Sequence, residues 1–154
     1  MSIRTSLIIT VALSVGVLVP VGVVQADSGE AVSPSSDLST QLAVGGRHAC
    51  AIENSKVYCW GDNTRYQLGS TQGYPSSNVP IEVEGIDNAT AVVAGYEHSC
   101  ALLTDKTVKC WGSNQSKQLG RTGATSATPS DVAGLTNVIA LTAGDDFNLS
   151  LIHI

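Results

Sequence analysis

Residues 45–52 read Gly-Gly-Arg-His-Ala-Cys-Ala-Ile, and residues 95–102 read Gly-Tyr-Glu-His-Ser-Cys-Ala-Leu, at an offset of 50 positions. Two more blocks recur in the same order, Cys-Trp-Gly at 59–61 and 110–112, and Gln-Leu-Gly at 67–69 and 118–120. Their offset is 51, so a hairpin turn in the second copy absorbs one extra residue. Blocks that recur in order indicate an internal repeat of about 50 residues.

A third copy begins but is not completed. Residues 132–137 match residues 83–88, and Ala-Gly recurs at 143–144. The match then decays, because Phe147 and Leu149 stand where the second copy has a histidine and a cysteine. We therefore expect unit 1 at about 38–87, unit 2 at about 88–136 and a partial unit 3 at about 137–154.

Each unit reads as short strands. Runs at 40–44 and 90–94 favour strands that end at glycine, and runs at 49–52 and 57–60 favour a hairpin. Pairing Cys50 with Cys59 leaves a two-residue turn, Asn54-Ser55, and opposes Glu53 to Lys56 as a cross-strand ion pair. The second unit pairs Cys100 with Cys110 in the same way, around a longer turn.

The motifs Ala-Gly-x-x-His-x-Cys-Ala-Leu, Val-x-Cys-Trp-Gly and Gln-Leu-Gly resemble the regulator of chromosome condensation repeat family, most of all its secreted bacterial branch with paired cysteines. The resemblance implies a β-propeller, whose blades are four-stranded sheets. The expected fold is all-β, a partial β-propeller of about two four-stranded blades and the start of a third. A signal helix and a flexible linker are expected to precede it.

The four cysteines favour two structural disulfides, Cys50–Cys59 and Cys100–Cys110, because the hairpin register places each pair side by side. The alternatives are free thiols or a four-cysteine zinc site, whose usual Cys-x₂₋₄-Cys spacing is absent. No metal ion or other cofactor is expected.

Other residues recur once per unit, which favours structural roles over catalytic ones. His48 and His98 are expected to bond backbone within their own blades, and Trp60 and Trp111 to pack within the propeller. Asn63 and Asn114 resemble the family's turn asparagine, whose amide ties down local backbone. The remaining recurring residues, expected to allow tight turns, are Gly45, Gly95 and Gly144.

The chain of 154 residues carries 15 glycines and only 14% charged residues, which suits short strands joined by turns. Its net charge of −5 speaks against nucleic-acid binding. Residues 1–26 read as a signal peptide, with Arg4 before an apolar run, and residues 27–37 as a flexible linker. The expected location is extracellular or periplasmic; the alternative is anchoring to a membrane by an uncleaved N-terminal segment.

We expect a secreted, non-enzymatic binding module whose partner is a protein or a surface glycan. The turn residues differ between units, so the candidate binding loops contain Arg47, Tyr74, Tyr96 and Glu97. Tyr74 falls in a longer connection at 71–78, and Asp145-Asp146 reads as a solvated turn. The alternative is a cell-surface carbohydrate-active enzyme or an inhibitor-like domain of the same fold.

Two and a fraction blades do not close a propeller ring, which needs at least about four. The sequence therefore favours a fragment of a longer propeller. Self-assembly of several chains to complete the ring is the alternative.

Overall fold

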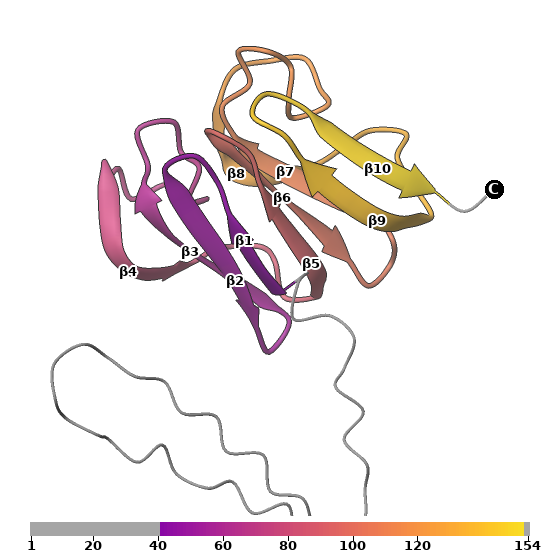
Figure 1. Cartoon of the computed structure of the whole chain (residues 1–154), viewed down its shortest axis with the longest axis horizontal. Helices are drawn as coiled ribbons and strands as arrows, with labels where there is room; N and C mark the ends of the chain where they lie inside the picture. Colours follow the sequence, from indigo (N-terminus) through magenta and orange to yellow (C-terminus); the bar gives the residue numbers. More distant parts are fainter. Residues whose placement is uncertain (1–40, 153–154) are drawn as a thin grey trace, which may run out of the picture. The chain divides into compact units, whose positions relative to one another are not determined.

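The computed structural model describes residues 41–152, which form ten β-strands in three antiparallel sheets (Figure 1). The first sheet contains β1 (Leu42–Val44), β2 (His48–Glu53), β3 (Lys56–Asp62) and β4 (Ser76–Glu82). The second contains β5 (Ala89–Ala94), β6 (His98–Leu103), β7 (Val108–Gly112) and β8 (Ser126–Asp131). A hairpin of β9 (Val138–Ala143) and β10 (Asn148–Ile152) follows. The fold is an all-β partial propeller.

Each sheet falls within one of the three sequence units, in strand order. The expected signal peptide at 1–26 and linker at 27–37 lie outside the described residues. Within residues 41–152, no helix is long and apolar enough to cross a membrane.

The predicted hairpin registers are confirmed. Cys50 pairs with Cys59, and Asn54 and Ser55 form the turn with φ values of 52° and 63°. Cys100 likewise pairs with Cys110. Positive φ at both central residues matches the right-handed twist of the strands, which explains why so short a turn suffices.

The predicted ion pair between Glu53 and Lys56 is wrong, although the two residues do oppose each other in the register. Lys56 Nζ instead lies 2.6 Å from Glu82 Oε1 on β4. The Tyr58 hydroxyl donates to the other oxygen of Glu82 (3.4 Å). Because β4 brings this carboxylate beside β3, the ammonium turns away from β2.

The connection expected at 71–78 is shorter than predicted, because β4 already begins at Ser76. Ser77 pairs with Gly61, and Glu82 pairs with Tyr58, with a register shift between them. Pro80 lies inside this strand. Proline is tolerated here because β4 is an edge strand, whose outer N–H groups have no ladder partner.

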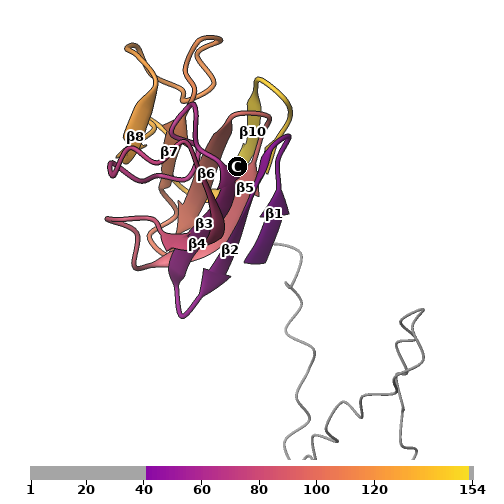
Figure 2. The same ribbon diagram turned by 90° about the vertical axis from the view of Figure 1, so that its left-hand side faces the viewer.

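The sheets lie side by side as successive blades, and β5 contacts β1 on one side and β9 on the other. Figure 2 shows β1 beside β5. Trp111 on β7 is fully buried among side chains of the first sheet and its loops. The core between the two blades consists of Cys50, Val57, Cys59, Leu68, Val83, Ile86, Ala89, Val92, Ala101, Leu103 and Trp111. Burial of this apolar area, at roughly 25 cal/mol per Å², is what holds one blade against the next.

Candidate functional site

The turns that join β1 to β2, β5 to β6 and β9 to β10 form a ladder across the blades. Gly46 donates its N–H to Gly95 O (3.1 Å), and Tyr96 donates its N–H to Asp145 O (3.0 Å). Each turn is therefore fixed to the next by a backbone hydrogen bond. The backbone that carries the turn side chains is therefore held in place.

We call a group of residues on the first two of these turns, the end of β3 and the adjoining loop the turn surface; it comprises Arg47, Asp62, Arg65, Tyr96 and Glu97. The Tyr96 ring packs on Gly46 so closely that a Cβ there would overlap it. Tyr96 is nevertheless 45% exposed. The glycine thus lets the ring lie flat against one turn while its outer side faces solvent.

The turn surface carries two ion pairs. Arg47 Nε lies 3.3 Å from Asp62 Oδ2 within the first blade, and Arg65 Nε lies 3.6 Å from Glu97 Oε2 across the two blades. The arginine side chains are 58% and 45% exposed. Exposed pairs contribute only about 0–1 kcal/mol to stability. Their main effect is to orient the charged side chains on the turn surface.

Asp62 sits deeper than the arginine that it contacts. Burial alone would raise the pKa of its carboxyl group, but hydrogen bonds from Thr64 and the charge of Arg47 outweigh burial and lower it. The Thr64 N–H and hydroxyl both donate to this carboxylate, at 3.0 and 3.1 Å. Asp62 therefore stays ionised at neutral pH.

Tyr74, the fourth candidate binding residue, does not join the turn surface. It is 54% exposed and lines an open groove of about 580 Å³ that runs along Ser76–Ile81 of the first sheet. Its backbone carbonyl accepts the Asn63 Nδ2–H bond (2.8 Å). The structure thus brings Arg47, Tyr96 and Glu97 together and places Tyr74 elsewhere.

Asp62 and Arg65 were not among the site residues predicted from the sequence. Both occupy positions at which the repeat units differ, because serine stands at the equivalent places in unit 2, Ser113 and Ser116. The same criterion that selected Arg47 and Glu97 would have found them. Asp145 and Asp146 are exposed in the β9–β10 turn, where Gln118 Nε2 donates to Asp146 Oδ1 (3.4 Å).

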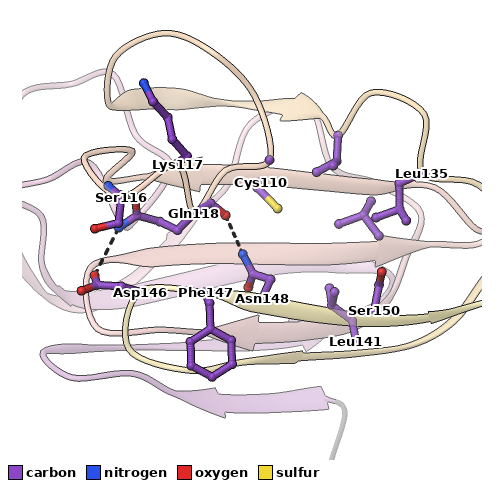
Figure 3. A pocket seen from close by; sticks show the side chains of 13 residues that line it. Cys110, Ser116, Lys117, Gln118, Leu135, Leu141, Asp146, Phe147, Asn148 and Ser150 are labelled. Carbon is purple, nitrogen blue, oxygen red and sulfur yellow. Dashed lines mark hydrogen bonds between the residues drawn. The ribbon is translucent and has the colours of Figure 1, made fainter.

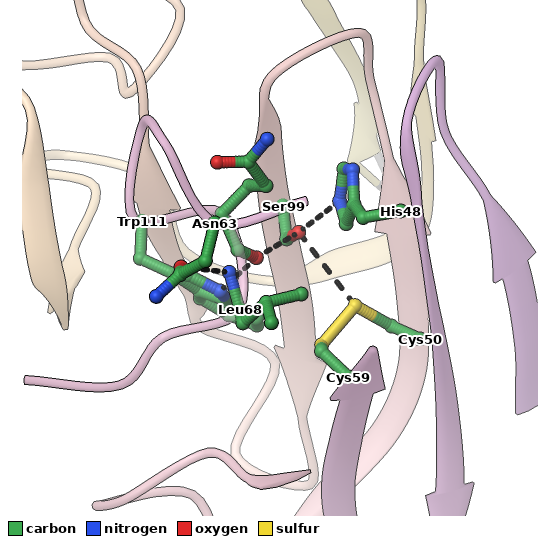
Figure 4. Close-up of a disulfide and its surroundings, with 8 residues drawn as sticks. His48, Cys50, Cys59, Asn63, Leu68, Ser99 and Trp111 are labelled. Atoms are coloured by element: carbon green, nitrogen blue, oxygen red, sulfur yellow. Dashed lines mark hydrogen bonds between the residues drawn. A yellow bond between two sulfur atoms is a disulfide. The ribbon is translucent and has the colours of Figure 1, made fainter. Parts of the chain in front are cut away.

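Both hairpins are closed by disulfides, Cys50–Cys59 and Cys100–Cys110. Figure 4 shows the first of these bonds. All four half-cystines are buried, and the described residues contain no free cysteine. Each bond joins β-strands that are already paired. It therefore locks the register that places the turn residues.

The recurring histidines bond across blades, and not to backbone within their own blade as we expected. His48 Nε2 lies 2.8 Å from Ser99 Oγ on the next sheet, and His98 Nε2 lies 3.1 Å from Asn148 Oδ1 on the hairpin. Ser99 Oγ in turn donates to Gln67 O (3.0 Å) in the first blade. The reason is that the histidine ring, lying over the turn glycine, points toward the neighbouring blade (Figure 4).

Burial makes these histidines hard to protonate. The pKa of His48 is lowered to about 4, mainly by loss of hydration and then by the charge of His98, with Asp62 opposing both. The pKa of His98 is also lowered by burial, although the hydrogen bond that the ring donates to Asn148 Oδ1 opposes this shift. Both imidazoles are therefore neutral at physiological pH, which suits a structural role.

Trp111 also acts across blades. Its Nε1–H donates to Gln67 O (3.0 Å), and the ring lies against the place of Gly69 (Figure 4). Trp60, its counterpart in unit 1, is only half-buried, and no blade precedes it among the described residues. The tryptophan of one blade therefore fits onto the Gln-Leu-Gly block of the blade before it.

Asn63 and Asn114 hold the loops that carry this block. Asn63 Oδ1 accepts the Leu68 N–H bond (3.1 Å), and Asn114 Oδ1 accepts the equivalent bond from Leu119 (3.1 Å). Both asparagines are buried. Their amides tie down the loop backbone, as the sequence resemblance implies.

The turn glycines have a different purpose from the one predicted. Gly45, Gly95 and Gly144 do not adopt positive φ, so the turns do not need their flexibility. A Cβ at each would instead overlap the ring three residues later, which is histidine in the first two units and Phe147 in the third. Close packing of a ring on the backbone is what excludes other residues.

Comparison with known proteins agrees with this arrangement. A family model for the regulator of chromosome condensation (RCC1) repeat matches residues 54–102 and 107–151. A second model of the same repeat matches residues 40–67 and 89–118. The chain belongs to the RCC1 repeat family.

RCC1-type relatives are longer than this chain. It is 34% identical over 114 residues to the human protein named probable E3 ubiquitin-protein ligase HERC6, covering 68% of this chain and 11% of that protein. It is 33% identical over 126 residues to the mitochondrial RCC1 domain-containing protein RUG3 of Arabidopsis thaliana, covering 73% and 28%. The chain thus spans less than a third of the length of these relatives.

Solved RCC1-type structures share the blade arrangement. Yeast RCC1 (Prp20), solved bound to Kap60, superimposes with a TM-score of 0.62 at 28% identity, covering 72% of this chain and 27% of that one. Human WBSCR16 gives a TM-score of 0.64 at 20% identity, covering 73% and 30%. Within residues 41–152, no group of three or more His, Cys, Asp or Glu side chains is placed to hold a metal ion.

Proposed function

We propose that this chain is an exported, non-enzymatic module that binds a partner protein through the turn surface. The observation that carries the proposal is the exposed Tyr96 ring, which packs on Gly46. The next residue after each of these two, Arg47 and Glu97, belongs to an ion pair. Tyrosine and arginine are the residues most enriched at the energetic centres of protein interfaces. A ring that is already ordered loses little entropy when a partner covers it.

The two ion pairs give the turn surface a defined arrangement of positive and negative charges, which a partner of complementary charge can recognise. Arg47 and Arg65 are the more exposed members, and Asp62 and Glu97 lie deeper, at 12% and 24% side-chain exposure. Within these two ion pairs, the guanidinium groups are thus the outer charges. We infer that the partner presents carboxylates around an apolar centre, because such a surface complements the pattern.

A protein is preferred over a glycan as the partner because of the relatives. Yeast RCC1 was solved in complex with the protein Kap60. Repeat loops on a rigid propeller scaffold are suited to such contacts. The whole activity of the longer relatives is not transferred to this chain.

The carboxylates of the turn surface do not favour hydrolysis. A general acid at neutral pH needs a raised pKa, whereas the pKa of Asp62 is lowered by its hydrogen bonds despite burial. Glu97 is held by Arg65. This chemistry supports a binding role over the carbohydrate-active alternative.

Export is supported by the two disulfides. Such bonds persist in oxidising compartments and are rare in the cytosol. The N-terminal segment read as a signal peptide would deliver the chain there.

The test is affinity capture with the disulfide-intact chain, using extracellular fluid or periplasmic extract as the source of partners. The wild-type chain is compared with Tyr96→Ala and with the matched control Tyr74→Ala, since both tyrosines are exposed to a similar degree. We expect a protein that is retained by wild type and by Tyr74→Ala and is lost with Tyr96→Ala.

Equal retention by all three chains would contradict the use of the turn surface. A glycan array probed in parallel distinguishes the other partner class. Binding to a glycan that depends on Tyr96, with no protein retained, would replace the proposed partner.

A further inference from the structure

A pocket of about 330 Å³ lies between the second sheet and the β9–β10 hairpin (Figure 3). It is separate from the turn surface residues that carry the proposed function. Its main lining residues are Gln118, Gly120, Val132, Leu135, Leu141 and Asn148.

Because the units repeat, the pocket has an equivalent position one blade earlier, and the residue that occupies that position is known. Between the first and second sheets, that place is filled by the Trp111 ring, which lies against Gly69 and donates to Gln67 O. Val83 also lies against Gly69 and belongs to the same buried cluster as the ring. The pocket beside β10 is built from the residues that stand at the same positions in unit 2, namely Gln118, Gly120 and Val132.

Hydrogen bonding at the two places differs by one donor. Gln67 O accepts two hydrogen bonds, from Ser99 Oγ and from Trp111 Nε1. Gln118 O accepts a bond from Asn148 Nδ2 (2.6 Å), the counterpart of the serine bond. A carbonyl oxygen has two lone pairs, so Gln118 O can take an indole N–H just as Gln67 O does.

Burial differs in the same sense. Val83 and Ile86, beside the Trp111 ring, are 0% and 2% exposed. Their counterparts Val132 and Leu135 are only half-buried and face the pocket. An aromatic ring in the pocket would bury apolar surface that the described residues leave open to solvent.

The strand next to the pocket has an edge that suits strand addition. Within residues 41–152, β10 pairs only with β9, whereas β2 and β6 each pair on both sides. Gly144 donates to Phe147 O (2.8 Å), and hydrogen-bonded pairs alternate along an antiparallel hairpin. The Ser150 N–H and C=O, which oppose Leu141, therefore point away from β9 and toward the free edge.

We propose that the β10 edge and the adjoining pocket form a docking site for a tryptophan-bearing β-strand of the same repeat type as β7. The strand pairs antiparallel with β10 and places its tryptophan opposite Asn148, as Trp111 stands opposite Ser99. Its indole fills the pocket and donates to Gln118 O. Leu149 stands where the second unit has Cys100, so this strand is held without a disulfide.

The probe is a fluorescently labelled peptide copied from residues 106–113, with Cys110→Ser to prevent disulfide exchange. Its matched control carries Trp111→Ala in addition. We expect the tryptophan peptide to bind the full chain about tenfold or more tightly than the control in fluorescence anisotropy. Hydrogen exchange of the β10 amides should slow only with the tryptophan peptide.

Two chain variants locate the site. Ser150→Pro removes the outward N–H of β10, and Val132→Phe fills the pocket; each should weaken the tryptophan peptide about tenfold or more. Unchanged exchange in β5–β8 shows that a variant has folded. The second variant keeps the test decisive if the first does not fold.

The proposal is overturned if the two peptides bind equally, if neither binds, or if both folded variants bind like wild type. The other possible occupant of the β10 edge is a second copy of this chain, and analytical sedimentation of the chain alone tests for such a dimer. A dimer that Ser150→Pro disrupts would assign the β10 edge to a second copy and would also overturn the proposal.

Discussion

Two interfaces join successive blades: the first lies between the first and second sheets, and the second lies between the second sheet and the β9–β10 hairpin. They share their polar contacts but differ in their apolar packing. Both have a histidine that bonds across to the next blade, at His48 and at His98. In both, the residue that this histidine contacts donates a hydrogen bond back to a backbone carbonyl of the preceding blade. Ser99 donates to Gln67 O, and Asn148 donates to Gln118 O. The first also holds the buried Trp111 ring, whereas the second holds a pocket.

This difference separates two contributions to blade packing. The polar contacts are present at both interfaces, so they set how neighbouring blades align. The indole is present at one interface only, and the residues around it are buried there and half-buried at the other. We conclude that the polar bridge fixes the alignment of the blades and that the tryptophan accounts for the deeper burial of the residues around it at the first interface.

The largest effect is expected from Trp111→Ala. Removing a fully buried tryptophan should lower the free energy of unfolding by about 3–5 kcal/mol. Trp60→Ala is the matched control, because Trp60 has the same place in its repeat but is only half-buried. Chemical denaturation should show a clearly smaller loss for the control; equal losses would contradict the comparison.

Acid should weaken the first interface through His48. Its pKa is about 4 in the folded chain and 6.5 as its ordinary value, so between these pH values the unfolded chain binds the extra proton. Stability should be complete above pH 6.5 and fall by about 3 kcal/mol as the pH drops toward 4. His98, whose pKa is also lowered, adds to the loss in the same direction.

The measurement is the free energy of unfolding from pH 7.5 to pH 4, in wild type and in His48→Gln. The variant cannot titrate at this position, so its curve should be flatter. A variant with the same pH slope as wild type would show that His48 is not responsible.

The disulfides should matter less than Trp111 and should matter about equally. Replacing both cysteines of either pair by serine should cost roughly 2–3 kcal/mol, because each bond closes a short loop in the unfolded chain. Calorimetry on the two double variants measures this. A cost well below 1 kcal/mol for either pair would show that the paired strands hold the register unaided.

The smallest effects are expected at the two polar bridges. Ser99→Ala leaves the buried His48 Nε2 without its partner and should cost about 1–3 kcal/mol. Asn148→Ala should cost less, since Asn148 is half-buried and water can replace it. Denaturation of the two variants ranks them, and a larger cost for Asn148→Ala would reverse the comparison.

Much of this fold was predictable from residues 45–69 and their copies at 95–120. The offset between the Gly-x-x-His-x-Cys and Cys-Trp-Gly blocks fixed the hairpin register, because paired cysteines must lie opposite each other. What failed was the direction of side chains between blades. The sequence places His48 near Cys50, but only the stacking of sheets shows that its ring reaches Ser99.

The candidate site was predicted in part. Arg47, Tyr96 and Glu97 follow from turn positions that differ between units, and the structure brings them together. Tyr74 lies apart from them, beside the groove along Ser76–Ile81, because β4 starts earlier than expected. Its role in binding stays a prediction. The ion pair of Glu97 with Arg65 joins residues 32 positions apart on two blades, and no local pattern shows it.

Hydrogen exchange of the folded chain at amide resolution tests the central claim most directly. If the tryptophan accounts for the deeper burial at the first interface, β6 amides should exchange only through large openings of the chain. The β10 amides that bond to β9 should exchange much faster, through local opening of the hairpin. Equal protection of β6 and β10 would contradict the account, because the interface that lacks an indole would then be as stable as the one that has it.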